Sequence, residues 1–304
     1  MKIFSSIAKH ALVAAVLSCL VLPQPAAARS YHPATSYLVK VNGQVFRQQN
    51  AGIRRAPASL TKMMTALVVM ERCGLDEVVV VSRGAARETG SRIGLRRGEK
   101  FRVRDLLAAT LIASANDACR ALADHACGNQ GDFVVQMNAR ARALGLENTH
   151  FANACGHDNR GLYSNAHDLA RLAERAMQLP QFAKIVARHD IRITTIDGRR
   201  NYYLRNKNRL IGRYPGAIGV KTGTTPNAGQ CLVAVAQRED TRVLLLVIMH
   251  SRNRWGAAPA LLDAAFAASS PRRAPVRTTD TEPPPPVRRE DEAPPEGTVV
   301  PDQE

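Results

Sequence analysis

The stretch APASLTKMMTALVVMERCG, residues Ala56–Gly74, constrains the fold more than any other part of the chain. Its apolar residues recur at helical spacing and leave few polar positions, which predicts a largely buried helix from Ser59 to Cys73. Gly74 then provides a stop signal. Ser59 and Lys62 stand three positions apart, so they lie on one face at the start of this helix.

A serine and a lysine in this arrangement are a candidate nucleophile and its base. A serine hydroxyl attacks poorly unless a base takes its proton. A lysine acts as that base only when its amine is neutral, and both burial and a second nearby cation lower its pKa. The S-x-x-K pattern alone is weak, because about one match is expected by chance in a chain of this length, and a helix cap beside a surface lysine would explain it equally well.

Two further short motifs strengthen the first. Ser114-Ala115-Asn116 separates two predicted helices, and Lys221-Thr222-Gly223-Thr224 ends a predicted strand. Gly223 allows a substrate backbone to approach that strand closely. Lys221 supplies a second cation, and the hydroxyls of Thr222 and Thr224 can bind a carboxylate. Asp117 beside the second motif is expected to serve the helix start, without a catalytic role.

Strand patterns lie at both ends of the chain, and helical patterns fill the middle. The expected fold is therefore α/β of the α+β type, with one antiparallel sheet built from both ends and an all-helical insertion packed against it. The strands are expected over residues 37–46 as a hairpin with its turn at Asn42-Gly43, and over Val78–Val81, Ile191–Ile196, Ile218–Lys221, Cys231–Ala236 and Val243–Met249, the last two joined by a turn at Arg238–Thr241. The helices are expected over Val103–Ile112, Asn116–His125, Asp132–Leu144, Ser164–Met177 with Ser164 as its cap, and Ala260–Ala268.

Residues 1–28 have the pattern of a secretory signal peptide. Lys2 and Lys9 supply the positive region, a twelve-residue apolar run follows over Ala11–Leu22, and small residues at Ala26–Ala28 offer a cleavage site. The run is too short to span a membrane, and no later run approaches spanning length. We therefore expect cleavage after Ala28 and an exported, periplasmic or secreted, mature chain without a transmembrane segment.

A proline-rich tail is expected over residues 271–304. It contains nine Pro in 34 residues and no aromatic residue, so it cannot bury enough apolar surface to fold alone, and we expect it to be disordered. The folded catalytic body is then residues 29–270. This body is strongly basic: the whole chain carries +16, the leader contributes two lysines, and the tail has five Arg against eight acids, which leaves about +17. Such a body suits an anionic polymer such as cell wall, and the export signal argues against nucleic acid.

Six cysteines occur, and Cys19 leaves with the leader. The odd number that remains means that at least one stays unpaired in a monomer. Cys119 and Cys127 are eight positions apart on one predicted helix, about 12 Å of rise, which is too far for a disulfide. No C-x-x-C spacing occurs. We therefore expect small buried hydrophobic side chains and neither a metal nor a cofactor.

Taken together, these motifs resemble those of the low-molecular-weight penicillin-binding proteins that act as D-alanyl-D-alanine carboxypeptidases. S-x-x-K, S-x-N and K-T-G occur in the expected order, separated here by 55 and 107 residues. Ala56–Ala66 is similar to the family's nucleophile helix almost throughout, Ser114–Ala118 to its second motif and Gly219–Thr225 to its third. The resemblance covers Ser36–Phe266 and implies a β-lactamase/transpeptidase-like fold.

The resemblance also implies a serine-type hydrolase that removes the terminal D-alanine from peptidoglycan stem pentapeptides through an acyl-enzyme. Ser59 would attack the carbonyl between the two D-alanines, Lys62 would take its proton, and Ser114 would relay a proton to the leaving amine. The backbone N–H groups of Ser59 and Thr224 would form the oxyanion hole. β-Lactams mimic the D-alanyl-D-alanine end and would acylate Ser59. The residues implied in substrate binding are Asn116, Lys221, Thr222, Gly223 and Thr224.

Three positions depart from the family pattern. Thr224 stands where His or Tyr is frequent, Gln230 where an aromatic residue is common, and His157 where Leu is usual. The first two lie on the substrate side, which leaves the substrate preference open. His157 is expected to be an ordinary core or surface residue.

Three alternatives remain at this stage. A class A β-lactamase needs a carboxylate that activates the deacylating water, whereas no Glu-x-x-Leu-Asn stretch follows Asn116, and Glu174 is expected on a solvated helix face. A D,D-endopeptidase would use the same residues on cross-linked peptides, so sequence does not separate it. A non-enzymatic wall-binding protein would fit the basic charge but does not require Ser59, Lys62 and Lys221 together.

Overall fold

A computed structural model describes residues 34–238 and 243–269 of the chain. The expected leader over 1–28, the expected tail over 271–304 and most of the expected turn at Arg238–Thr241 lie outside these residues. No helix in the described part is long and apolar enough to cross a membrane.

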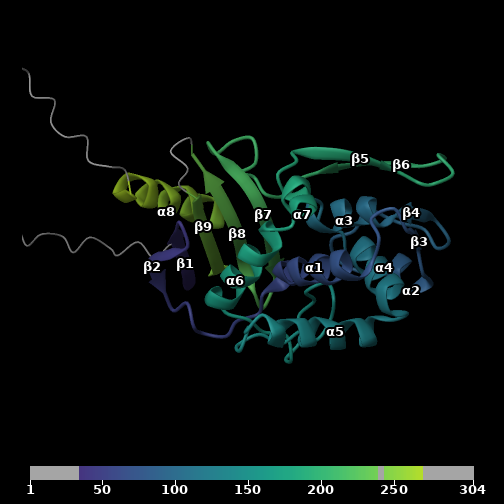
Figure 1. Ribbon diagram of the computed structural model, residues 1–304, viewed down its shortest axis with the longest axis horizontal. Helices are drawn as coiled ribbons and strands as arrows, with labels where there is room; N and C mark the ends of the chain where they lie inside the picture. Colours follow the sequence, from purple (N-terminus) through teal and green to yellow (C-terminus); the bar gives the residue numbers. More distant parts are fainter. Residues whose placement is uncertain (1–33, 239–242, 270–304) are drawn as a thin grey trace, which may run out of the picture. The chain divides into compact units, whose positions relative to one another are not determined.

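A five-stranded antiparallel sheet forms one half of the described body (Figure 1). The strand order is β2-β1-β9-β8-β7, so the N-terminal hairpin pairs with the last strand of the chain. This arrangement confirms the predicted sheet built from the two ends. The strands are β1 (Ser36–Val41), β2 (Gln44–Gln49), β7 (Ala217–Thr225), β8 (Gly229–Gln237) and β9 (Val243–Ser251).

Alternate residues of the central strands bury into two separate cores. On β8, Leu232 and Ala234 pack into a cluster with the C-terminal helix α8 (Arg254–Ser269), whereas Val233 and Val235 pack into the larger cluster with the remaining helices. Side chains alternate between the two faces of a strand, so a fully apolar strand must be covered on both sides. The sheet is therefore a buried middle layer.

A lobe rich in helices covers the other face of the sheet, and its central helix is α1 (Figure 1). Two small two-stranded antiparallel sheets, β3-β4 and β5-β6, accompany the helices. The elements of this lobe are α1 (Lys62–Arg72), β3 (Val78–Val80), α2 (Arg83–Ala86), β4 (Lys100–Arg102), α3 (Val103–Leu111), α4 (Asn116–Cys127), α5 (Gln130–Ala143), α6 (Ala166–Met177), α7 (Pro180–Val186), β5 (Asp190–Thr194) and β6 (Asn201–Arg205).

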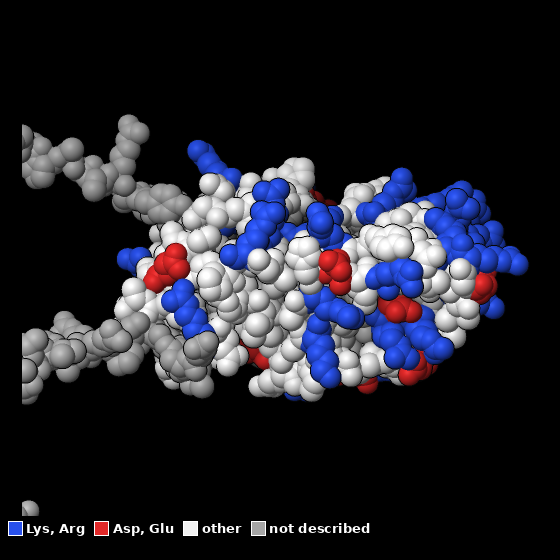
Figure 2. Space-filling view, turned by 90° about the horizontal axis from the view of Figure 1, so that it is seen from above, with Lys and Arg blue, Asp and Glu red and all other residues white. Residues whose placement is uncertain are grey.

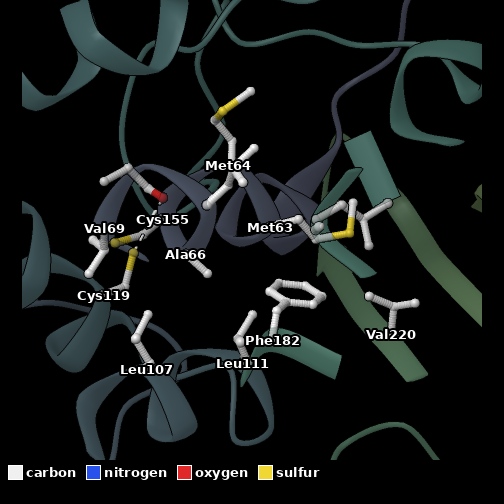
Figure 3. Close-up of a cluster of buried hydrophobic side chains, with 14 of the residues drawn as sticks. Met63, Met64, Ala66, Val69, Leu107, Leu111, Cys119, Cys155, Phe182 and Val220 are labelled. Atoms are coloured by element: carbon white, nitrogen blue, oxygen red, sulfur yellow. Dashed lines mark hydrogen bonds between the residues drawn. The ribbon is translucent and has the colours of Figure 1, made fainter. Parts of the chain in front are cut away.

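Helix α1 is buried along most of its length, as its apolar pattern predicts. Its side chains meet α3, α7 and β7, with Met63 lying near Phe182 and Val220 (Figure 3). Each large apolar side chain that is fully buried here contributes roughly 1.5–3 kcal/mol. A single truncation such as Leu67→Ala, at a position with no solvent exposure, would cost about 2–5 kcal/mol. The helix that carries the first motif is thus fixed on every side.

Several predicted boundaries need correction. The nucleophile segment is not α-helical at Ser59, because a 3₁₀ turn, η1 (Ala58–Thr61), precedes α1. Ser164 is not the cap of α6; Asn165 is, and its Oδ1 accepts the N–H of Asp168 at 2.8 Å. Helix α8 begins at Arg254, six residues before the expected Ala260, and contains Pro259 in its second turn. Proline has no N–H, so the helix loses one backbone hydrogen bond at this position.

Candidate active site

Ser59 lies in the tight turn η1 at the sheet end of α1. The turn is closed by a hydrogen bond from the N–H of Leu60 to the carbonyl of Pro57 at 3.2 Å, and Ala58 has a left-handed φ of 48°. A non-glycine residue in that region stores strain that the surrounding structure must hold. Gly156 helps to hold it, because it packs so closely on Ala58 that an added Cβ would overlap the Ala58 carbonyl. The turn thereby fixes the Ser59 hydroxyl.

The Lys62 amine is completely buried and aimed at Ser59. Its Nζ lies 3.0 Å from Ser59 Oγ, and it also donates to Asn116 Oδ1 at 2.7 Å and to the carbonyl of Cys155 at 2.5 Å. A neutral lysine amine has two N–H donors and one lone pair, so with the donors on Asn116 and Cys155 the lone pair can face Ser59 Oγ. The expected pairing of the S-x-x-K serine and lysine is therefore present in the geometry.

The second serine pairs with the second lysine. Lys221 Nζ donates to Ser114 Oγ at 2.9 Å and to the carbonyl of Thr222 at 2.9 Å, and both side chains are buried. Ser114 has a left-handed φ of 58°, which turns the chain between α3 and α4. Burial, followed by the charges of Lys62, Lys207 and Arg254, holds the pKa of Lys221 well below the usual lysine value.

The two lysines form their side-chain hydrogen bonds with different hydroxyls. Lys62 hydrogen-bonds to Ser59, whereas the side-chain hydrogen bond of Lys221 goes to Ser114. The two amines nevertheless share one region, because the charge of Lys62 contributes to the lowered pKa of Lys221. The site therefore contains two serine–lysine pairs side by side.

Asn116 connects the first pair to the loop over residues 89–91. Its Oδ1 accepts from Lys62, its Nδ2 donates to the carbonyl of Thr89 at 2.6 Å, and its backbone N–H donates to the carbonyl of Ser91 at 2.6 Å. The side-chain amide is thus already hydrogen-bonded on both sides. Asp117 next to it has a structural role, as expected: its buried carboxylate accepts N–H groups of residues 93–95.

The third motif lies at the end of a strand, as predicted, but β7 continues to Thr225, four residues beyond the expected end at Lys221. Lys221, Thr222 and Thr224 pair with Val233, Leu232 and Gln230 of β8. Gly223 faces the nucleophile turn: a Cβ there would stand 3.0 Å from the Ser59 nitrogen and 3.1 Å from the Pro57 carbonyl oxygen. A side chain at this position would press on the turn, so glycine favours the close approach of β7 and η1, which form the two walls of the site.

Two cations at the site were missed by the sequence analysis. Arg254 Nη1 donates to the Gly223 carbonyl at 2.6 Å, to Thr224 Oγ1 at 2.9 Å and to the Cys231 carbonyl at 3.1 Å. Lys207 Nζ hydrogen-bonds to Ser91 Oγ, and burial, then Lys62, lower its pKa. Both residues belong to no motif and reach the site only through tertiary packing, so spacing along the chain gives no signal for them.

The loop after Gly156 joins the helical lobe to the site. His157 Nε2 pairs with Glu88 Oε2 at 2.9 Å, and Asp158 accepts from Thr225 Oγ1 at 2.6 Å and from the N–H of Asn227 at 3.1 Å. Burial alone would raise the pKa of Glu88, but the hydrogen bond and charge of His157 lower it. His157 is thus held by a side-chain contact with Glu88.

The cysteines after the leader are all free, and three of them are buried. Cys119 and Cys155 lie next to each other (Figure 3), and the backbone carbonyl of Cys155 accepts a hydrogen bond from Lys62. The group of metal-ligand side chains found in the described residues is Cys73, Glu77 and His125, at the far ends of α1 and α4. It is separate from both serine–lysine pairs, whose acceptors are hydroxyl, amide and carbonyl oxygens.

Known proteins share this architecture. The DacF D-alanyl-D-alanine carboxypeptidase of Bacillus subtilis is 37% identical over 231 residues, which is 74% of this chain and 59% of the relative. DacB2 of Mycobacterium tuberculosis is 34% identical over 244 residues, 77% of this chain and 83% of the relative. Among solved structures, a D-alanyl-D-alanine carboxypeptidase of Mycobacterium tuberculosis matches with a TM-score of 0.73 at 33% identity, covering 77% of this chain and 91% of its own.

A DD-transpeptidase of Streptomyces K15 matches with a TM-score of 0.72 at 31% identity, covering 77% of this chain and 98% of its own. These likenesses confirm the predicted penicillin-binding fold. A family model for D-alanyl-D-alanine carboxypeptidase matches residues 24–253, which include both serine–lysine pairs and the third motif. The chain therefore belongs to the D-alanyl-D-alanine carboxypeptidase family.

Proposed function

We propose that this protein is a serine-type D-alanyl-D-alanine carboxypeptidase that removes the terminal D-alanine from peptidoglycan stem pentapeptides and that β-lactams acylate covalently. The observation that carries the proposal is the hydrogen bond of 3.0 Å between Ser59 Oγ and the buried Lys62 amine. A nucleophile within reach of an oriented base is what covalent catalysis by serine requires. Family membership supplies the substrate class.

In the first step Ser59 Oγ attacks the carbonyl carbon between the two D-alanines, and Lys62 accepts the Ser59 proton. The amide C–N bond breaks, an ester forms on Ser59, and D-alanine leaves with a proton relayed through Ser114. Lys221 supports that relay through its buried hydrogen bond of 2.9 Å to Ser114 Oγ, which holds the Ser114 hydroxyl in place. Water then hydrolyses the ester and releases the shortened peptide.

Binding of the substrate falls to β7 and its neighbours. The N–H groups of Ser59 and Thr224 would stabilise the oxyanion, and the absence of a side chain at Gly223 lets strand and turn lie close enough for this. Thr222, Thr224 and Lys221 would bind the terminal carboxylate. Arg254 adds a permanent charge beside Thr224, through its hydrogen bond of 2.9 Å.

Asn116 would hold the substrate amide, as the resemblance implies. Its side chain already bonds to Lys62 and to Thr89, so in the complex it would exchange the Thr89 contact for the substrate carbonyl or amide. A class A β-lactamase needs a carboxylate that activates the deacylating water. Glu174, the carboxylate considered for that role, forms an ion pair with Lys40 instead.

We also propose that residues 1–28 are a cleaved export leader, that 29–270 form the catalytic domain and that 271–304 are a disordered tail. The peptidoglycan substrate lies outside the cytoplasm, which agrees with a periplasmic or secreted mature enzyme and with no role for nucleic acid. N-terminal sequencing of the protein from the periplasmic fraction should start at Arg29; an intact Met1 there would refute the leader.

The deciding experiment combines fluorescent penicillin with mass mapping of the adduct and an assay of D-alanine release from a stem pentapeptide. We expect one adduct per chain on the peptide containing Ser59, and no adduct in Ser59→Ala. A label at any other residue, or acylation without any release of D-alanine, would refute the assignment as a carboxypeptidase.

A further inference from the structure

A cysteine, a glutamate and a histidine come together at the end of the helical lobe that lies away from the catalytic serines. The side chains are those of Cys73, Glu77 and His125, and one donor atom of each lies within 4.8 Å of the other two. Cys73 and Glu77 are close in the chain, but His125 follows Glu77 by 48 residues, and this spacing matches no metal-binding motif. The fold alone brings these three types of metal ligand together.

The cluster lies where two helices of the active site end. Helix α1 begins at Lys62 and is followed by Cys73, while α4 begins at Asn116 and has His125 in its last turn. The two helices start together, because Lys62 donates to Asn116 Oδ1 at 2.7 Å, and they pack on each other (Figure 1). The 11 residues of α1 rise about 16 Å, so the cluster is roughly that far from the start of the helix.

The ends of both helices favour a cation. The carbonyl end of an α-helix carries a partial negative charge, equivalent to about half an elementary charge. Cys73 is the C-cap of α1, and His125 is in the last turn of α4, so the negative ends of both helices lie at the cluster. A metal ion bound there would be stabilised by both helices, whereas an anion would be repelled.

The Glu77 carboxylate is held in place by the turn that precedes it. One carboxylate oxygen, Oε1, accepts the N–H of Gly74 at 2.6 Å, and the Glu77 N–H donates to the Gly74 carbonyl at 3.1 Å. The Glu77 carbonyl accepts the N–H of Val103 at 3.0 Å. The second carboxylate oxygen, Oε2, lies 2.9 Å from His125 Nε2. One oxygen therefore fixes the carboxylate, and the other is directed at the cluster, as in a metal site whose ligands are oriented by hydrogen bonds.

The spacing of the donor atoms is close to that of a tetrahedral metal centre. Zinc bonds of about 2.3 Å to sulfur and about 2.0–2.1 Å to nitrogen or oxygen place neighbouring donors about 3.3–3.6 Å apart. In the structure His125 Nε2 and Glu77 Oε2 are 2.9 Å apart, and no two donor atoms of the cluster are more than 4.8 Å apart. Side-chain movements of about 1 Å would therefore complete the geometry.

The chemistry of the donors selects zinc among the common metal ions. Thiolate and imidazole ligands suit Zn²⁺, whereas Ca²⁺ and Mg²⁺ prefer oxygen ligands alone. One thiolate and one carboxylate also balance the two charges of the ion. The chain as a whole carries +16, and Lys and Arg predominate over acids on the face shown in Figure 2. Such a surface repels cations, so only specific ligands would retain zinc.

We infer that Cys73, Glu77 and His125 form a zinc-binding site, with water as the fourth ligand, that ties the far end of α1 to the far end of α4. On binding, the Cys73 thiol releases its proton to solvent, and sulfur, carboxylate oxygen and imidazole nitrogen each donate an electron pair to the metal. No oxidation or reduction is involved. The inference is independent of the proposed function, because neither serine–lysine pair takes part in it.

The test uses the purified protein, freed of metal, kept reduced and titrated with Zn²⁺ in competition with a chromophoric chelator. We expect one zinc ion per chain, and a rise in Tm of about 5–10 °C at a zinc concentration about 100 times Kd. Cys73→Ser, Glu77→Gln and His125→Gln should each weaken zinc binding at least about tenfold. Co²⁺ in place of Zn²⁺ should give a thiolate-to-cobalt charge-transfer band that is absent from Cys73→Ser.

The matched controls change the same residue types outside the cluster. His189 pairs with Asp190 at 2.8 Å and belongs to no such group among the described residues, and Cys127 is a half-buried free thiol at the end of α4. His189→Gln and Cys127→Ser should bind zinc within threefold of the wild-type affinity. Labelling of Ser59 by fluorescent penicillin checks that each variant is folded. Glu77 is exposed, so Glu77→Gln tests the site even where another variant does not fold.

Several results would overturn the inference. Zinc that binds equally to wild type and to the three ligand variants is adventitious, and a Tm that does not change with zinc means that no site is filled. A Cys127→Ser variant that loses as much affinity as Cys73→Ser would mean a different set of ligands. Mass spectrometry that finds Cys73 in a disulfide, in protein isolated without reductant, would also overturn it, because zinc binds the thiolate. None of these results affects the proposed function, which acylation of Ser59 and release of D-alanine test separately.

Discussion

Lys221 and Ser114 are 107 residues apart in the chain, and their side chains are joined by a buried hydrogen bond of 2.9 Å. Lys221 lies within β7, and Ser114 lies in the turn between α3 and α4. Their hydrogen bond therefore links the sheet to the helical lobe. Ser59 and Lys62 form the matching pair three residues apart. The site therefore depends on the docking of two layers as well as on one helix.

The buried Lys221 should make stability depend on pH. Its pKa is lowered in the folded protein, so the unfolded chain binds more protons between that value and about 10.5, and stability rises with pH through this window. The loss of stability caused by burying a charged Lys221 is complete below its pKa in the folded protein. It disappears as the pH approaches its pKa in the unfolded chain. Lys221→Met should therefore gain most in Tm, relative to wild type, at low pH.

Calorimetry from pH 5 to 10 measures this difference. Lys221→Met also loses the hydrogen bonds to Ser114 and Thr222, which lowers Tm equally at every pH. The informative quantity is therefore the slope of Tm against pH. Lys184→Met, at an exposed lysine of α7, should follow the wild-type slope. Parallel curves for Lys221→Met and wild type would mean that Lys221 is not destabilised by its surroundings.

Replacement of Lys62 should separate catalysis from folding. Lys62→Met removes the base and should lower the rate of acylation by a β-lactam about 10²–10⁴-fold. It also leaves Asn116 Oδ1 and the Cys155 carbonyl without their donor, at about 1–3 kcal/mol each. Stopped-flow acylation and urea unfolding check the two effects. An acylation rate of Lys62→Met within threefold of the wild-type rate would exclude Lys62 as the base. The control variant is Lys100→Met, at an exposed position of β4.

How much of the site the sequence could predict depends on the range of each contact. Ser59 and Lys62 are three residues apart, so their spacing in the sequence was enough to predict that their side chains lie together. The strands β8 and β9 were predicted because uninterrupted apolar runs require burial on both faces. By contrast, the end of β7 was missed because Thr222, Gly223 and Thr224 show no apolar pattern, and only their pairing with β8 makes them a strand.

Arg254 and Lys207 could not be predicted from one sequence, because nothing local distinguishes them from the other basic residues of a +16 chain. Their positions follow from the start of α8 beside β7 and from the loop after β6. The strand at Val78–Val81 was predicted and is present as β3, whereas its three-residue partner β4 was not predicted, because a strand that short is defined by its partner. These three omissions, Arg254, Lys207 and β4, thus concern tertiary contacts.

Asp117 should be required for stability although it has no part in the chemistry. Its carboxylate is 1% exposed and accepts the N–H groups of Gly94 at 2.8 Å and Leu95 at 3.0 Å. Asp117→Asn keeps one acceptor oxygen and points an N–H₂ at donors, so it should cost about 3 kcal/mol. Urea unfolding measures this. Asp132→Asn, at the exposed start of α5, should cost less than about 0.5 kcal/mol; equal losses would contradict the argument.

Gly156 should be irreplaceable because of its contact with the nucleophile turn. Its φ is +88°, and a Cβ there would overlap the Ala58 carbonyl and stand 2.8 Å from the Ser59 nitrogen. Backbone atoms cannot move aside as a flexible side chain does, so Gly156→Ala must displace Ser59. We expect labelling by fluorescent penicillin to fall more than about 100-fold, with a stability loss of about 3 kcal/mol or more.

Gly198 separates that contact from backbone strain alone. It has a similar φ of +73° in the turn after β5, but an added Cβ there would meet nothing within 4 Å. Gly198→Ala should therefore lose about 1–2 kcal/mol, from the left-handed conformation only, and label at the wild-type rate. If the two alanine variants lost equal stability and both labelled normally, the packing of Gly156 on Ala58 would have no part in positioning Ser59. The difference between the two variants, and not either value alone, measures how much the nucleophile depends on this contact.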